Sequence, residues 1–321
     1  MRADRSAGAG LGLALLSAAT FGTSGTFARS LIDAGWSADA AVAARVGAAA
    51  VLLAVPALWA LRDRWHVVGR SLGNISLFGL LAVGGAQVGF FNAVRYLPVG
   101  VALLLEYSGI VLVVLWMWLR HGERPRGLTI AGAVAAGAGL ILVLDPAGNG
   151  ARVDPVGVLW GLLAAVGLAG YFVLSARMDP QLPSIAMACG GMLSGALILL
   201  LLGGVGILPL EATFGTVDLA GHTTSWLVPV VGLVLVAGVV AYVAGIAAAR
   251  LLGAALSSFV GLTEVVFAVV IAWLVLGELP SAMQAAGGVC IIAGIVLVRL
   301  DQLRQAATLP AASAVPSRAE G

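Results

Sequence analysis

The chain has 321 residues, of which 61% are hydrophobic and only 10% charged, and its mean hydropathy is +1.07. An ordinary soluble domain has about a quarter charged residues, so this chain has too little polar material to cover a soluble core. These values exclude a soluble enzyme, a disordered chain and a nucleic-acid-binding protein. The net charge of +2 gives no reason to expect an acidic partner. Cys189 and Cys290 lie inside long apolar runs, which excludes a disulfide scaffold or a zinc site.

Ten apolar segments of about 20 residues follow one another along the chain, each long enough to cross the hydrocarbon core as a helix. They cover 9–29, 38–61, 71–94, 97–119, 127–144, 156–176, 182–208, 226–249, 252–276 and 281–299. The runs are continuous, which favours helices over the alternating pattern of a β-barrel. The first run, preceded by Arg2 and Arg5, also resembles a signal peptide, but nine further spans make an uncleaved helix the simpler interpretation.

The distribution of arginine predicts the orientation of these helices. With the N-terminus inside the cell, about 13 arginines fall in cytoplasmic segments and about three, Arg29, Arg95 and Arg152, in outer loops. We therefore expect a multi-pass protein of the inner (cytoplasmic) membrane with both termini in the cytoplasm. Residues 301–321 are expected to form a disordered cytoplasmic tail, because they are rich in Ala, Ser and Pro.

The fourth and fifth spans are similar to the ninth and tenth at a constant offset of about 155 residues. About 17 of 53 aligned positions are identical. The matched pairs include Arg95 and Arg250, Trp118 and Trp273, Gly122-Glu123 and Gly277-Glu278, Pro125 and Pro280, Gly132 and Gly287, and Gly139 and Gly294. The chain therefore divides into two five-span halves, 1–145 and 155–300. Because five is odd, the second half enters the membrane from the opposite side, an arrangement common in carriers with alternating access. The alternative is a duplication retained only for stability.

These residues also carry a family resemblance, which extends from about Leu11 to Val298. The doubled pattern of an aromatic residue, an aliphatic run, Gly-Glu and a later pair of glycines resembles the two EamA repeats of the drug/metabolite transporter superfamily. The segment Glu106-Tyr107-Ser108-Gly109-Ile110 is similar to the Glu-Phe-x-Gly-Pro segment of the threonine/homoserine exporter branch, and Leu262-Thr263-Glu264-Val265-Val266 to the Leu-x-Glu-Pro-Val/Ala segment of the family. Both segments of this chain lack the proline of the family pattern, because its position is taken by Ile110 in the first and by Val265 in the second. The resemblance implies an all-α integral membrane fold of ten transmembrane helices, a central cavity, and export or import of small metabolites.

Three ionisable residues, Arg45, Glu106 and Glu264, lie well inside predicted spans. A charge at membrane depth costs at least about 2.5–3.5 kcal/mol and usually marks a transport pathway. We expect both carboxylates near the midplane, where they would bind a substrate ammonium or a coupling proton. The alternative is a structural carboxylate bonded to a neighbouring helix or to Arg45. Arg45 is similar to the family's Arg in an Arg-Val/Phe-x-x-Ala-Ala segment, and it could bind a substrate carboxylate, neutralise Glu106, or extend outward to the membrane surface.

Further polar residues complete the candidate site. Gln87 and Tyr242 occupy matching positions of the third and eighth spans, Asn92 follows about one turn later, and Tyr171 lies in the sixth span. Loop-edge residues Glu123 and Glu278 are expected to act as gate or capping residues rather than substrate ligands. The remaining histidines and acids show no metal-ligand spacing, and no cofactor motif is present.

The sequence thus predicts a secondary transporter of small organic metabolites rather than an enzyme. A phosphate-binding loop is absent and the chain has no Lys, which excludes a self-contained ATP-driven pump. A proton needs only one titratable group, so proton coupling is favoured over sodium. The preferred function is export of amino acids or related compounds. The alternatives are multidrug efflux or uptake by the same fold and, more distantly, a membrane enzyme or lipid scramblase. Nothing in the sequence specifies an oligomeric state.

Overall fold

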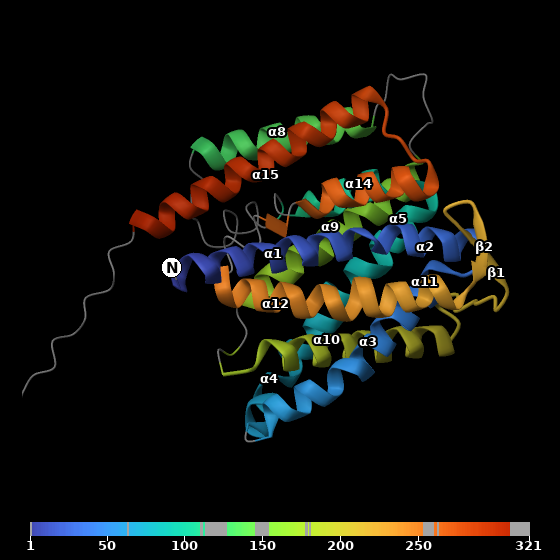
Figure 1. Cartoon of the computed structure of the whole chain (residues 1–321), viewed down its shortest axis with the longest axis horizontal. Coiled ribbons are helices and arrows are strands. Elements are labelled where there is room, and N and C mark those ends of the chain that lie inside the picture. Colours follow the sequence, from blue (N-terminus) through green and yellow to red (C-terminus); the bar gives the residue numbers. More distant parts are fainter. Residues whose placement is uncertain are drawn as a thin grey trace, which may run out of the picture.

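A computed structural model describes residues 2–62, 64–109, 112, 127–144, 154–176, 179, 181–252, 260–261 and 263–308. The described chain is mostly helical, and its long helices run side by side along one axis (Figure 1). Helical residues occur in each of the ten segments expected to span a membrane. Five described segments are long and apolar enough to cross one, and four shorter apolar helices accompany them. Together they indicate a multi-pass membrane protein, while the full number of ten crossings stays a prediction.

The first half begins with α1 and α2, which together occupy the first expected span. A break at Thr23 separates them. The elements of this half are α1 (Arg2–Gly22), α2 (Ser24–Asp33), α3 (Ala38–Leu61), α4 (Trp65–Phe78), η1 (Gly79–Gly85), α5 (Ala86–Tyr96), α6 (Val99–Tyr107) and α8 (Gly127–Leu144). Ser37 caps α3, because its side chain accepts a hydrogen bond from the Ala40 N–H.

The second half has a similar order of helices and one added hairpin. Its elements are α9 (Pro155–Ala176), α10 (Ser184–Gly204), β1 (Thr216–Leu219), β2 (His222–Ser225), α11 (Leu227–Val231), η2 (Gly232–Val240), α12 (Ala241–Leu252), α14 (Thr263–Leu276) and α15 (Ala282–Thr308). The antiparallel strands β1 and β2 form a small sheet between the expected seventh and eighth spans. They lie beside the end of α2 (Figure 1).

The C-terminal helix corrects one expectation from the sequence. α15 continues to Thr308, so residues 301–308 are helical and do not begin a disordered tail. Asp301 is buried and accepts a 2.6 Å hydrogen bond from the Thr129 hydroxyl at the start of α8. This contact binds the extension to the helix pair, which explains why the helix persists beyond the apolar run. The remainder of the expected tail, 309–321, lies outside the described residues.

The two halves pack through equivalent contacts. Helix α3 packs on α10, α6 on α14 and α8 on α15, while α1 contacts α12 and α14 as α9 contacts α5 and α6. Figure 1 shows α8 and α15 side by side at one edge of the bundle. A methyl group added at Gly139 would lie 2.6 Å from the Gly287 carbonyl oxygen, and one added at Gly294 would meet the Gly132 carbonyl oxygen. Gly132 therefore lies opposite Gly294, and Gly139 lies opposite Gly287, so the two helices run antiparallel in close contact.

Two wide helical turns lie at matching places in the halves. η1 and η2 are π-helical, and adding the repeat offset of about 155 to residues 79–85 gives 234–240, which falls within η2. Such segments are rare and frequently accompany functional sites. Both contain glycines in close contact with neighbouring helices, since a methyl group at Gly79 would meet the Gly191 carbonyl oxygen and one at Gly232 the Phe27 ring. The repeat therefore extends to the third and eighth expected spans.

Candidate functional site

Arg45 lies at the centre of a buried polar cluster. Arg45 lies in the first half of α3 and is 4% exposed. One terminal nitrogen, Nη1, donates to the Ser24 hydroxyl and to Gln87 Oε1, each at 2.7 Å. The other, Nη2, donates to the Ala237 carbonyl oxygen at 2.9 Å. The side chain therefore joins three other helical segments and does not extend outward to the membrane surface.

Both intramembrane acids lie near Arg45 without pairing with it. The charges of Glu106 and Glu264 interact with each other and with Arg45. However, no oxygen of either carboxylate lies within 4.0 Å of a guanidinium nitrogen of Arg45, so neither forms an ion pair with it. Glu264, at the start of α14, accepts a 3.0 Å hydrogen bond from the Tyr107 hydroxyl. No hydrogen bond joins the Glu106 carboxylate to another described residue.

The neutral residues expected in the pathway separate into two groups. Gln87 accepts from Arg45, and Tyr242 and Tyr171 lie near the same cluster, with Tyr171 38% exposed. The Tyr242 ring packs edge-on against Phe21, with ring centroids 5.1 Å apart. Asn92 is directed elsewhere, because its amide donates to Asp39 at 3.1 Å and to the backbone of its own helix. The cluster therefore includes three of the four expected neutral residues.

The irregular helical segments provide several of these contacts. Ser24 is the first residue of α2 after the break at Thr23, and Ala237 lies within η2. Gln87 is the second residue after η1. A helix break or a π-helical turn displaces backbone carbonyls from their usual partners, and the Ala237 carbonyl, within η2, accepts from Arg45. Arg45 consequently contacts the first span and both π-helical spans at or beside their irregular turns.

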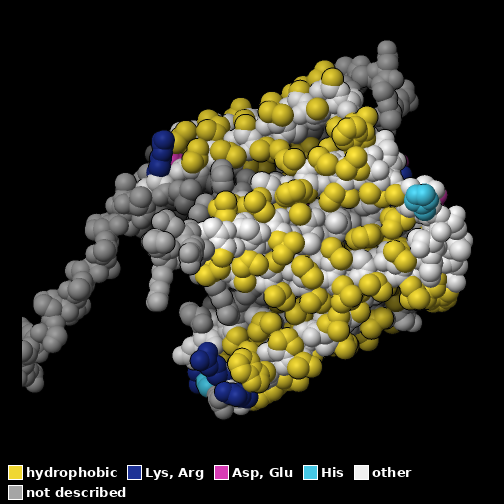
Figure 2. Space-filling view, in the orientation of Figure 1, with side chains coloured by type: hydrophobic (Ala, Val, Ile, Leu, Met, Phe, Trp, Pro, Cys, Tyr) yellow, Lys and Arg dark blue, Asp and Glu magenta, His cyan; other side chains and the backbone are white. Residues whose placement is uncertain are grey.

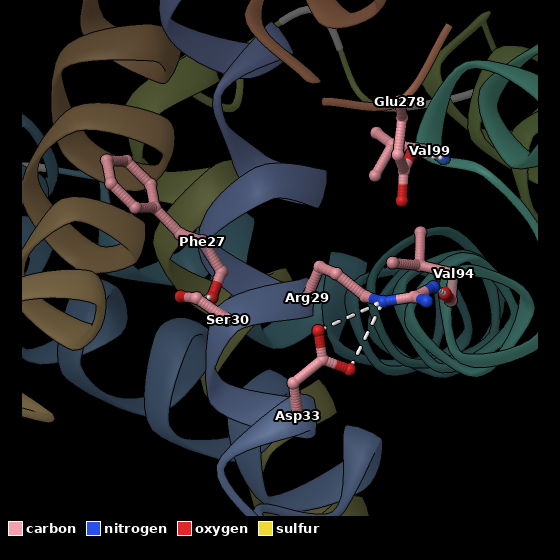
Figure 3. A network of polar contacts seen from close by, with 7 residues as sticks. All are labelled: Phe27, Arg29, Ser30, Asp33, Val94, Val99 and Glu278. Atoms are coloured by element: carbon pink, nitrogen blue, oxygen red, sulfur yellow. Dashed lines mark hydrogen bonds and ion pairs between the residues drawn. The ribbon is translucent and has the colours of Figure 1, made fainter. Parts of the chain in front are cut away.

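A second polar network lies near the end of the bundle that carries the hairpin. Figure 3 shows Arg29, which forms a 3.2 Å ion pair with Asp33 and also donates to the Val94 carbonyl oxygen. In the same view, Glu278 points toward the start of α6, where its Oε2 accepts a 2.9 Å hydrogen bond from the Val99 N–H. Glu278 thus caps a helix of the first half from a turn of the second. The equivalent acid, Glu123, lies outside the described residues.

Two residues of these networks were not recognised in the sequence. Tyr107 is adjacent to Glu106 but bonds to the other acid, a contact that depends on how α6 crosses α14. Asp39 is 4% exposed and pairs with Asn92, although its place at the start of a span suggests a solvated position. An acid six residues before Arg45 on α3 is the only sequence signal that would have indicated it.

In chemical terms the cluster can bind a cation. If both carboxylates are ionised and Arg45 is protonated, their three formal charges sum to −1. Such a charge at membrane depth must be matched by a cation or removed by protonation. The free acceptor capacity lies on Glu106 and on the second oxygen of Glu264, because Tyr107 occupies only one oxygen. An ammonium group or a proton satisfies this requirement, and a second anion does not.

Comparisons with known proteins agree with this description. The model of the EamA-like transporter family matches residues 8–145 and again 155–300. A probable terminal-alkyne amino-acid exporter of Streptantibioticus cattleyicolor is 30% identical over 276 residues, which cover 82% of this chain and 86% of the exporter. An uncharacterized transporter of Clostridium kluyveri is 26% identical over 235 residues, covering 72% and 73% of the two chains. A solved crystal structure has a TM-score of 0.53 at 20% identity and covers 95% of this chain and 98% of its own, which shows a shared fold.

Proposed function

Because the chain belongs to the EamA-like transporter family, we propose that it is a proton-coupled secondary carrier that exports amino acids or related small amines. The observation that carries the proposal is the pair of intramembrane carboxylates, Glu106 and Glu264. They share one cluster with Arg45, yet Arg45 forms an ion pair with neither. A transported ammonium or a proton provides the missing positive charge. The S. cattleyicolor relative, named as a probable exporter of an amino acid, supports this substrate class.

The two carboxylates have different surroundings, which suggests different roles. Glu264 is bonded to the Tyr107 hydroxyl, whereas Glu106 has no hydrogen bond to another described residue. We assign Glu106 to the exchange of the proton and Glu264 to the substrate ammonium, with Tyr107 orienting the Glu264 carboxylate. Arg45 has further N–H groups beyond the three it donates to Ser24, Gln87 and Ala237. In this proposal they bind the carboxylate of the amino acid, whose charge its own ammonium balances, so the proton on Glu106 supplies the remaining positive charge.

Alternating access is supported by the relation between the two halves. The antiparallel contact of α8 and α15 pairs Gly139 with Gly287 and Gly294 with Gly132, which are equivalent positions of the repeat. An inverted repeat requires such an antiparallel pair about its twofold axis. The segments η1 and η2 occupy equivalent positions next to the Arg45 cluster. We propose that they are the places at which the third and eighth spans bend as the site opens to one side and then to the other.

A counterflow experiment tests the proposed function. Proteoliposomes are loaded with an unlabelled amino acid that stabilises the purified protein against heat, and uptake of the labelled compound is measured. We expect exchange by the wild type, and its loss in the Glu264→Gln variant. Glu211→Gln, in the exposed loop before the hairpin, is the matched control and should exchange normally. Exchange of lipophilic cationic dyes in place of any amino acid would contradict the substrate class, and equal exchange by Glu264→Gln would contradict the site.

A further inference from the structure

A basic cavity lies where α3 ends and α4 begins, away from the polar cluster described above. It has a volume of about 320 Å³ and is lined by Trp59, Ala60, Arg62, Arg64 and Pro183. Pro183 immediately precedes α10, so the cavity is bounded by three helix ends. The Arg62 guanidinium lies over the Trp59 ring, 5.2 Å from its centroid. This contact places one positive charge at the wall of the cavity beside an aromatic side chain.

More basic side chains follow the cavity residues along the chain. His66 and Arg70 are exposed and lie one turn apart on α4, directly after the cavity residues. Figure 2 shows the arginine side chains and a histidine gathered at the end of the bundle at which α1 also begins. In sequence, the segment 62–70 contains three arginines and one acid, Asp63, which lies outside the described residues. The segment therefore has a net charge of +2, which favours an anionic ligand.

An apolar surface leads directly to this basic site. Val51, Val55, Leu58 and Trp59 fall on one face of α3, at spacings of four, three and one residues, and all are exposed. Val55 is 74% exposed and Trp59 is 69% exposed, on a helix long and apolar enough to span a membrane. In a bilayer such a face contacts acyl chains, and Trp typically lies at the level of the headgroups. The headgroup level is therefore next to the cavity, with Arg62 and Arg64 at its wall.

We propose that this cavity binds the phosphate headgroup of an anionic phospholipid, whose acyl chains lie along the exposed face of α3. Basic pockets at helix ends on the cytoplasmic side can bind anionic headgroups in this way. The apolar face favours a lipid over free phosphate, since inorganic phosphate has no apolar part that could contact it. The occupant does not depend on which metabolite is transported, so the proposal stands or fails independently of the proposed function.

Lipid binding by the purified full-length protein in detergent tests this proposal. The probes are a phosphatidylglycerol, a phosphatidylcholine with identical acyl chains, and inorganic phosphate, each scored by native mass spectrometry or by the shift in thermal unfolding. We expect binding of phosphatidylglycerol that exceeds binding of phosphatidylcholine and persists in millimolar inorganic phosphate. Each arginine near an anionic surface contributes about fivefold to affinity, so Arg62→Gln with Arg64→Gln should weaken binding about 30-fold.

Matched variants separate this site from a general effect of charge. Arg2→Gln with Arg5→Gln removes the same charge from α1 and should leave binding unchanged, while Arg62→Lys with Arg64→Lys should retain most of it. If the double glutamine variant does not fold, Arg64→Gln alone should still show a loss of about fivefold. The proposal is overturned if both lipids bind equally, if the Arg62 and Arg64 variant binds like the wild type, or if inorganic phosphate displaces the lipid.

Discussion

Removing Arg45 should affect transport far more than stability, whereas removing its partner Gln87 should affect stability directly. Arg45→Met deletes three hydrogen bonds, to Ser24, Gln87 and Ala237. Such bonds average about 0.6 kcal/mol each in membrane proteins. The deletion also removes a charge that costs at least about 2.5–3.5 kcal/mol at membrane depth. With Glu106 and Glu264 protonated in its absence, we therefore expect an unchanged or slightly higher free energy of unfolding. Gln87→Leu, in contrast, leaves a buried guanidinium donor unsatisfied, which costs about 1–3 kcal/mol.

A double-mutant cycle measures this contact. Unfolding free energies of the wild type, Arg45→Met, Gln87→Leu and the double variant are obtained by titrating detergent micelles with SDS. The cost of Gln87→Leu should disappear in the Met background, giving a coupling of about 1–3 kcal/mol. Gln181→Leu, in the exposed turn before α10, is the control and should be additive with Arg45→Met within about 0.5 kcal/mol. An equal cost of Gln87→Leu in both backgrounds would refute the assignment of Gln87 as an Arg45 ligand.

Three further predictions test the arrangement of the helices. Gly139→Ala should lower the thermal unfolding midpoint, because its methyl group would meet the α15 backbone at 2.6 Å. Gly137→Ala is the control and should leave the midpoint unchanged, since no atom lies within 4 Å of the added methyl group. Equal midpoints of the two variants would contradict the packing. Arg124→Cys and Ser281→Cys, in a background without the native cysteines, should react with an impermeant thiol reagent from opposite sides of the membrane, and labelling from one side only would disprove the inverted repeat. Glu278→Ala should lower the unfolding free energy by about 1 kcal/mol through loss of the α6 cap, and Glu278→Gln should lose less, so an equal loss in both would exclude capping.

Helix positions could be predicted from the sequence because a bilayer permits few alternatives. An apolar run of about 20 residues must satisfy its backbone internally, and a helix does so. The α15 extension was missed for the opposite reason, because residues 301–308 are not apolar. Their helix continues from α15, and Asp301 is bonded to Thr129 on another helix. A contact between residues 172 positions apart leaves no local signal in the sequence.

The candidate site was predictable in part. Depth in the membrane identified Arg45, Glu106 and Glu264, and the repeat offset identified Gln87 and Tyr242 as equivalent. Which groups bond to which depends on the crossing of helices, and the sequence contains no pattern for that. The π-helical segments η1 and η2 could not be predicted from the sequence either. Their hydrogen-bond register depends on close packing of glycine-containing segments against neighbouring helices.

The most direct test of proton coupling through Glu106 is gradient-driven transport by the Glu106→Gln variant. Glutamine keeps the volume and the hydrogen-bonding capacity of Glu106 but cannot titrate. In proteoliposomes with an imposed pH gradient, we predict that this variant fails to accumulate the substrate although it still exchanges substrate without a gradient. Glu264→Gln should lose both activities, and the Glu211→Gln control should retain both. Accumulation at the wild-type rate by Glu106→Gln and by Glu264→Gln would show that these acids are structural and would contradict the mechanism.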